Sequence, residues 1–140
     1  LLPESLPKLP LIVVNGDVLT NINYGDLLDC HKNNLAVATI CVREHEYQVP
    51  YGVVSSVDGY VTDMVEKPVQ IYHVNAGIYV LDQEIVDSVE KEVPIDLPSL
   101  LETKLDRKVM VYAFYDYWVD VGRMEDFKKA NADIRHLKLW

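Results

Sequence analysis

The sequence predicts an α/β domain with a Rossmann-like mixed, mostly parallel sheet, which helices flank and into which a β-hairpin is inserted. Two observations lead to this prediction. Apolar runs at 11–15 and 35–42 enclose a helical pattern at 23–33, which is the order of a parallel βαβ unit. Further along, two strand-like runs meet at Asp58-Gly59, a dipeptide that favours the tight turn of a β-hairpin.

The composition of the chain limits the classes of protein and partner. Its 140 residues, 49% of them apolar, are enough for one domain with a real core. The net charge of -9 would repel a phosphate backbone, so nucleic acid is not an expected partner. No apolar run approaches the ~18 residues of a membrane span and no leader is visible, so we expect a cytoplasmic protein without a membrane partner. Cys30 and Cys41 lack metal-ligand spacing and are expected to be buried, reduced thiols.

The first expected elements follow from residue type and capping. The strand expected at 11–15 begins with four apolar residues, Leu11 to Val14, and is rich in β-branched residues, which is typical of a strand covered on both faces. Asn23 is a good N-cap for the next helix, which is expected to reach about Asn33. The run 35–42 is expected to be a second buried strand. The apolar face of the helix at 23–33 is expected to hold Leu27, Leu28 and His31.

The second half of the sequence predicts three more strands and three helices. The region 71–82 favours a strand that Asn75-Ala76-Gly77 interrupts, and Asp96 is a candidate N-cap for a later helix. That helix is expected to contain Leu100, Leu101 and Leu105. The other expected elements are a connector at 1–10, a helix from about Gln83 to Lys91, strands at 109–115 and 117–121, and a final helix from about Met124 with Phe127, Ala130, Ile134 and Leu137 on one face.

Two carboxylates are candidates for a metal site. Asp17 follows the first apolar run, and in open α/β sheets ligands sit beyond the carboxyl ends of the strands. Gly16 lets the backbone turn there and lets a ligand come close. Asp120 also ends an apolar run, just before Gly122. Two carboxylates at strand ends suit a shared Mg²⁺. The plainer alternatives are a solvated acid in a β–α loop for Asp17 and a helix cap for Asp120.

Two further motifs are candidates for binding a phosphorylated sugar. In "EKP", Lys67 suits a phosphate group and Glu66 suits sugar hydroxyls. Asn75 lies in an apolar strand, so its side chain must be satisfied by backbone or by a ligand. Gly52 and Gly77 would let a ligand approach the main chain. An exposed Glu-Lys pair and an isolated glycine are also common as surface residues and bends.

Taken in order, these motifs resemble one family. "VVNGD", "YGVV", "MVEKP", "VNAGIYVLD" and "YWVDVGRMEDF" are similar to the sugar-phosphate nucleotidylyltransferases, the nucleoside-diphosphate-sugar pyrophosphorylases. The resemblance covers nearly the whole chain and implies part of the GT-A-like nucleotidylyltransferase fold. It implies that a sugar 1-phosphate attacks the α-phosphorus of a nucleoside triphosphate, giving an NDP-sugar and pyrophosphate. Such a step needs positioning and charge neutralisation.

The resemblance also implies roles for single residues. Asp17 and Asp120 match the acids that hold the catalytic Mg²⁺, and Lys67 matches the lysine that contacts the sugar phosphate. The positions matched to substrate binding are Gly16, Gly52, Glu66, Asn75 and Gly77.

One departure from the family pattern concerns the nucleotide. The family opens with a glycine-rich loop that cradles the triphosphate, whereas no two of the six glycines here are closer than seven residues. Residues 1–140 are therefore expected to be the C-terminal part of a catalytic domain, inactive alone, and "LLPE" to be the end of a preceding helix. Without a neighbouring strand, the run 11–15 would expose an apolar edge, so we expect a homo-oligomer.

Three other interpretations compete with this one. A non-catalytic regulatory or assembly subunit could carry the same type of domain. A metal-dependent glycosyltransferase usually presents two acids separated by one residue, and "GDVL" after Gly16 lacks the second acid. A flavodoxin-like domain would need a phosphate loop that "NGDVLTNIN" does not match. The motifs identify neither the base nor the sugar.

Overall fold

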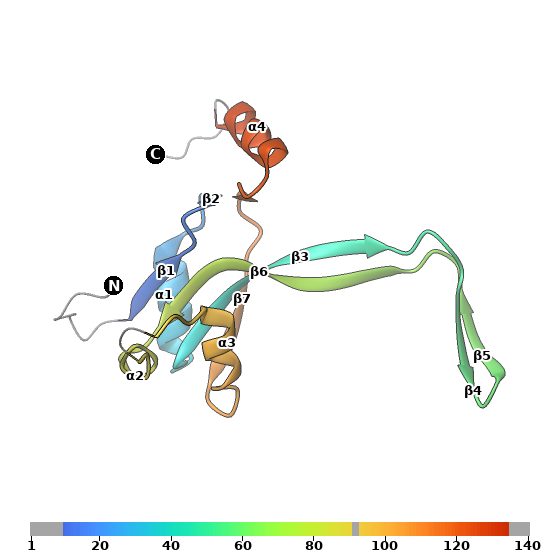
Figure 1. Ribbon diagram of the computed structural model, residues 1–140, viewed down its shortest axis with the longest axis horizontal. Helices are drawn as coiled ribbons and strands as arrows, with labels where there is room; N and C mark the ends of the chain where they lie inside the picture. The colour runs from blue at the N-terminus through green and yellow to red at the C-terminus, as the bar shows by residue number, and fades with distance from the viewer. Residues whose placement is uncertain (1–9, 91–92, 135–140) are drawn as a thin grey trace.

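The structure, a computed structural model, describes residues 10–90 and 93–134 and is built on a four-stranded sheet (Figure 1). The strands lie in the order β1 (Leu11–Val14), β6 (Val69–Leu81), β3 (Ala38–Gln48) and β7 (Val109–Ala113). Because β6 pairs antiparallel with β1 and β3 while β7 pairs parallel with β3, three strands run one way and β6 runs the other. The predicted mixed sheet is confirmed, with β6 between the two strands of the βαβ unit.

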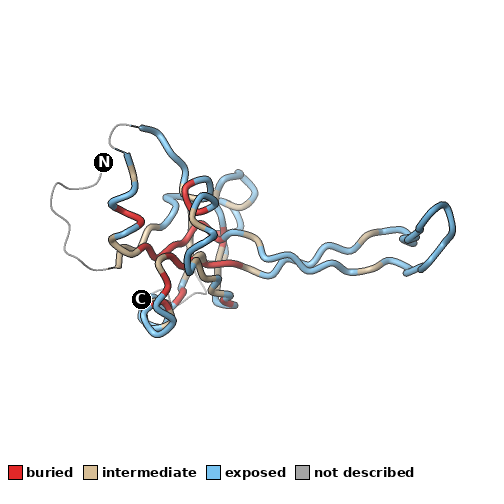
Figure 2. Tube along the Cα trace, turned by 90° about the horizontal axis from the view of Figure 1, so that it is seen from below, coloured by how far each residue is buried: buried red, intermediate tan, exposed pale blue. Residues whose placement is uncertain are grey.

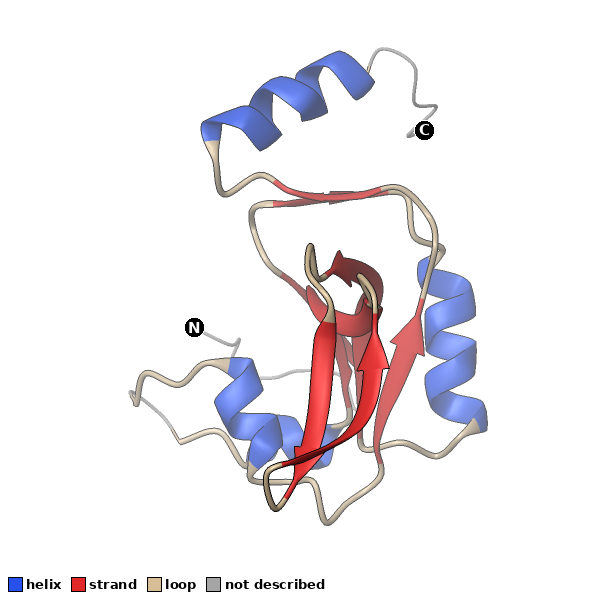
Figure 3. Cartoon of the chain, turned by 90° about the vertical axis from the view of Figure 1, so that its right-hand side faces the viewer, coloured by secondary structure: helices blue, strands red, loops and turns tan. Residues whose placement is uncertain are grey.

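Helices cover both faces of this sheet, as predicted (Figure 3). Helix α1 (Tyr24–Asn33) packs on one face, and α2 (Gln83–Asp87) and α3 (Leu97–Glu102) on the other. Successive side chains of a strand point to opposite faces of the sheet. The side chains of β6 therefore contribute in turn to two core clusters, one on each face. One core cluster consists of Ile22, Leu27, Cys41, Ala76, Ile78, Val80 and Phe114. The other consists of Ala38, Tyr79, Leu81, Ile85, Val86, Leu100 and Leu101.

The caps predicted from the sequence set the starts of two helices. The Asn23 side chain accepts a hydrogen bond from the Gly25 backbone N–H at 2.9 Å, and α1 begins at Tyr24, directly after Asn23. Asp96 accepts one from the Ser99 backbone N–H at 2.9 Å and begins α3. Helix α3 ends before Leu105, which is exposed, and α2 is shorter than expected. The helical spacing in the sequence therefore overestimated the length of both short helices.

The predicted hairpin forms the tip of a long arm. Strands β4 (Val53–Val57) and β5 (Tyr60–Val65) meet at Asp58-Gly59, whose positive φ angles of 50° and 84° are those of a primed turn. The sequence did not reveal that β3 continues to Gln48 and pairs there with β6, which carries the hairpin away from the body (Figure 1). Figure 2 shows that the arm is almost entirely exposed.

The expected interruption of β6 is a bulge inside a continuous strand. Ile40 pairs with Tyr79 and Val42 pairs with Asn75, so three residues of β6 face the single residue between Ile40 and Val42. Gly77 adopts a φ of +69° within this bulge, a conformation that L side chains rarely adopt. The bulge lets β6 stay paired while its backbone bends beside the candidate site.

A second, two-stranded sheet joins the two ends of the described chain. Strand β2 (Val18–Thr20), which the sequence did not predict, pairs antiparallel with β8 (Trp118–Asp120). Helix α4 (Met124–Asp133) begins shortly after β8 and buries Ala130. Phe127 and Ile134, which were expected on the same apolar face, are exposed. Leu137, Lys91 and the expected connector and "LLPE" helix end at 1–9 lie outside the described residues.

Two of the composition-based expectations can be compared with the described residues. Cys41 is fully buried, and this burial raises the pKa of its thiol to about 12, whereas Cys30 is half-buried. Among the described helices, none is long and apolar enough to cross a membrane.

Candidate functional site

The β2–β8 pair makes neighbours of the chain segments that carry the two acids predicted from separate motifs. Val18 lies directly opposite Asp120 in this ladder. The Val121 backbone N–H donates to the Asp17 carbonyl at 2.8 Å, which extends the pairing by one step. The chain segments that carry Asp17 and Asp120 are therefore neighbours, although they come from opposite ends of the sequence. Both acids are exposed, so their carboxylates are accessible to a ligand.

The backbone after Asp120 fixes one oxygen of its carboxylate. Asp120 Oδ1 accepts a hydrogen bond from the Gly122 N–H at 2.9 Å, and a Cβ on Gly122 would lie 3.0 Å from that oxygen. At Gly16 a Cβ would meet nothing within 4 Å, so its surroundings are open. No group of three or more Asp, Glu, His or Cys side chains suited to a metal occurs in 10–90 and 93–134. Two carboxylates still suit Mg²⁺, which commonly takes its other ligands from water and substrate phosphates.

The β6 bulge places Asn75 and Gly77 beside the first strand. Asn75 donates to the Tyr79 hydroxyl at 2.7 Å and accepts from the Gly77 N–H at 3.0 Å, so the protein itself satisfies this polar side chain. The Asn15 N–H donates to the Gly77 carbonyl at 2.8 Å. A Cβ on Gly77 would lie 2.7 Å from Asn15 Nδ2, so the Asn15 side chain occupies the space that the glycine leaves.

Trp118 links this bulge to the acid pair. Its Nε1–H donates to the Ala76 carbonyl at 2.8 Å, which ties β8 to the bulge of β6. A cavity of about 430 Å³ lies between these parts and is lined by Asn15, Asn75, Ala76, Gly77, Tyr79, Asp96, Leu97, Pro98 and Asp120. Sequence reasoning assigned no role to Asn15 or Trp118. The signal for both was their place inside "VVNGD" and "YWVDVG", next to the acids.

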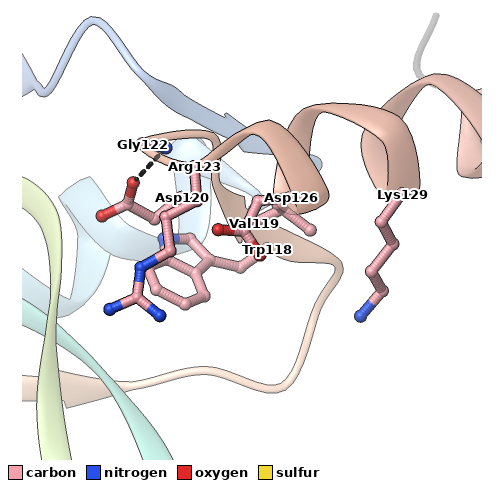
Figure 4. Close-up of a pocket in the computed structure, with 7 residues that line it drawn as sticks. All are labelled: Trp118, Val119, Asp120, Gly122, Arg123, Asp126 and Lys129. Carbon is pink, nitrogen blue, oxygen red and sulfur yellow. Dashed lines mark hydrogen bonds between the residues drawn. The ribbon is translucent and has the colours of Figure 1, made fainter.

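A second cavity of about 490 Å³ lies on the α4 side of Asp120 (Figure 4). Its lining combines acidic, basic and aromatic side chains: Trp118, Val119, Asp120, Gly122, Arg123, Asp126 and Lys129. Asp120 thus borders both cavities. The basic residues of this second cavity were not among the candidates from the sequence.

The remaining candidates gather at the base of the hairpin, away from the acids. A Cβ on Gly52 would lie 2.9 Å from Glu66 Oε2, and the Lys67 N–H donates to the Tyr51 carbonyl at 3.3 Å. Lys67 itself has a positive φ of 46°. Eight positions of extended chain separate Lys67 from Asn75, which at about 3.3 Å per residue is on the order of 25 Å. Figure 1 shows this junction at the far end of the β3–β6 ribbon.

The predicted site residues therefore form two groups. The acid group consists of Asp17 and Asp120, which lie on paired chain segments. Asp120 lines the cavity together with Asn75 and Gly77, whereas Asp17 is not among the residues that line it. The arm group consists of Gly52, Glu66 and Lys67.

Comparisons with known proteins connect the chain to one group of enzymes. Residues 3–136 match the family model described as nucleotidyl transferase. The chain is 34% identical over 124 residues to a mannose-1-phosphate guanyltransferase of Yarrowia lipolytica, covering 84% of this chain and 34% of that protein. It is 32% identical over 124 residues, with the same coverage, to a protein of Dictyostelium discoideum named mannose-1-phosphate guanylyltransferase catalytic subunit beta. The chain thus spans about a third of the length of these curated relatives.

Solved structures share the fold. A provisionally named glucose-1-phosphate thymidylyltransferase from Bacillus anthracis, crystallised with sucrose, superposes with a TM-score of 0.66 at 17% identity, over 94% of this chain and 56% of that one. The structure of HddC from Yersinia pseudotuberculosis superposes with a TM-score of 0.61 at 25% identity, over 89% of this chain and 55% of that one.

Proposed function

Because the chain belongs to the nucleotidyl transferase family, among its sugar-phosphate nucleotidylyltransferases, we propose that it forms the sugar-phosphate and metal-binding part of such an enzyme. The proposed reaction joins a sugar 1-phosphate to a nucleoside triphosphate and releases pyrophosphate. The names of the relatives favour mannose 1-phosphate and GTP as substrates. The observation that carries the proposal is the pairing of β2 with β8, which makes neighbours of the segments that hold Asp17 and Asp120.

We assign the residues to roles that their chemistry suits. Asp17 and Asp120 would hold Mg²⁺, which when bound would neutralise phosphate charge. Asn75 and Gly77 line the cavity next to Asp120 and would contact the sugar. Glu66 and Lys67 carry the hydroxyl- and phosphate-binding chemistry but lie at the base of the hairpin. For both groups to contact one substrate, the β3–β6 ribbon must curve towards β8.

A non-catalytic role is the second candidate. The separation of Glu66 and Lys67 from the acids favours it, since a regulatory or assembly subunit need not unite both groups around one substrate. The two candidates differ in metal binding and turnover, and can be distinguished by experiment.

The test uses the 140-residue chain with Mn²⁺ as a paramagnetic substitute for Mg²⁺. We expect Mn²⁺ to bind, and Asp17→Asn and Asp120→Asn each to weaken binding about ten-fold or more, because each removes a charged ligand. Asp58→Asn is the matched control, since it removes the same charge at the hairpin tip, where Asn also tolerates the positive φ. Unchanged Mn²⁺ binding in both site variants would refute the metal assignment.

Turnover is measured in parallel as pyrophosphate release from GTP and mannose 1-phosphate. We expect none from this chain alone, which spans about a third of its relatives' length. Release by the isolated chain would overturn the view that it supplies only part of the site.

A further inference from the structure

The cavity between β8 and α4 contains basic side chains next to the proposed metal ligand. We propose that this cavity is a diphosphate-binding subsite in which Arg123 is the principal cation. The proposal rests on the proposed function, because it places the subsite beside Asp120. Its lining includes two basic residues, Arg123 and Lys129, in a chain whose net charge is -9. These two cations could attract an anionic ligand on a protein of net negative charge, provided that the acids in the same lining are offset.

Arg123 has its guanidinium available for a ligand. It occupies the N-cap position of α4 with extended backbone, and its side chain makes no capping hydrogen bond. It takes part in none of the ion pairs found within residues 10–90 and 93–134. Figure 4 shows its guanidinium directed to the same side as the Asp120 carboxylate. A guanidinium presents five donors in a planar fork that matches phosphoryl oxygens.

Lys129 extends the subsite along α4. It lines the same cavity six positions after Arg123, which is roughly 9 Å along a helix axis. Figure 4 shows the two cations at opposite ends of the group of side chains. A ligand with two linked phosphoryl groups can be held from both ends of such a cavity, whereas one orthophosphate would contact one cation at a time. The spacing therefore favours a diphosphate group, as in pyrophosphate or in a nucleoside triphosphate.

The acids of the cavity make this binding dependent on a cation. Asp120 and Asp126 offset the charges of Arg123 and Lys129, so the four side chains sum to zero at neutral pH. A divalent cation at Asp120 would leave the cavity with a net positive charge. Diphosphate binding should therefore be stronger with Mg²⁺ than without it.

The test is isothermal titration of inorganic pyrophosphate into the 140-residue chain in the presence of Mg²⁺. We expect Arg123→Gln to weaken binding about ten-fold or more, because it removes charge-assisted hydrogen bonds. Arg123→Lys keeps the charge but loses the fork and should lie between wild type and Arg123→Gln. Lys128→Gln is the matched control, since Lys128 is exposed, lies on the same helix and does not line the cavity.

The outcomes separate this proposal from the proposed function. Pyrophosphate binding that exceeds orthophosphate binding and depends on Arg123 supports the subsite, even if mannose 1-phosphate does not bind and no turnover is found. A GTP titration with the same dependence on Arg123 assigns the subsite to the nucleotide. No pyrophosphate binding by the wild-type chain, or equal binding by Arg123→Gln and Lys128→Gln, would overturn the proposal. Circular dichroism of each variant checks that it is folded.

Discussion

At the scale of single residues, Gly77 determines the shape of the cavity at the β6 bulge. Gly77→Ala should destabilise the protein by about 1–3 kcal/mol, because an L residue is strained at this positive φ. Its Cβ would also lie 2.7 Å from the Asn15 side chain. Urea unfolding measures the effect. Gly16→Ala is the control, since nothing lies within 4 Å of that position, and equal losses for the two variants would contradict this explanation.

The residues that the sequence identified correctly act locally. The Asn23 and Asp96 caps and the Asp58-Gly59 turn depend on hydrogen bonds and φ angles within a few positions, so their pattern is visible in the sequence. Trp118 could not be placed in the same way. Its hydrogen-bond partner is the backbone carbonyl of Ala76, 42 positions away. Because every residue type has a backbone carbonyl, the sequence does not indicate which residue is the acceptor.

At the scale of elements, the cap of α3 should make its contribution to stability dependent on pH. Hydrogen bonds from the Ser99 backbone N–H and hydroxyl lower the pKa of Asp96 below its usual value of 3.8. A lowered pKa means that the stabilisation is present above the unfolded-state pKa and is lost as the pH falls through the folded-state pKa. Asp96→Ala should therefore be less stable than wild type at pH 7, and the difference should shrink as the pH falls below 3.8. A difference that is constant between pH 7 and pH 3 in thermal unfolding would contradict this account.

The elements that sequence reasoning missed are short or depend on distant partners. Strand β2 has three residues, too few to show an alternation, and exists because β8 pairs with it. The outer part of β3 contains Glu44, His45 and Glu46, which do not suggest a strand on their own. They are extended because β6 supplies a ladder of hydrogen bonds. The extended conformation of these segments is therefore determined by pairing with strands far apart in sequence, because their local residue pattern does not determine it.

At the scale of the whole molecule, the exposed edge of β1 leads us to expect self-association. Within the described sheet, β1 pairs with β6 on one side and has no partner strand on the other. An apolar edge of this kind pairs readily with another chain. Sedimentation velocity at micromolar concentration should show a dimer or larger species, and Val14→Lys at the edge should shift it towards monomer. Leu35→Lys, at an exposed turn away from the edge, is the control. A clean wild-type monomer would refute this prediction.

The fold class and the strand ends that carry Asp17 and Asp120 were predictable, whereas the relation of the arm to the body was not. Helix and strand patterns, with the order of the motifs, indicated the mixed sheet and the two strand ends that carry Asp17 and Asp120. The distance between those acids and Lys67 depends on how far β3 and β6 remain paired, and nothing in the residue types of 43–48 indicates this.

The pairing of β2 with β8 also has a consequence for biosynthesis. Asp17 is among the first described residues to leave the ribosome, but Asp120 lies near the other end of the chain. The main sheet can assemble as soon as β7 has emerged, since all of its strands precede β8. The acid pair must wait for β8. During translation the main sheet can therefore form before the segments of Asp17 and Asp120 are joined, and a cation that needed both acids could bind only after β8 has emerged.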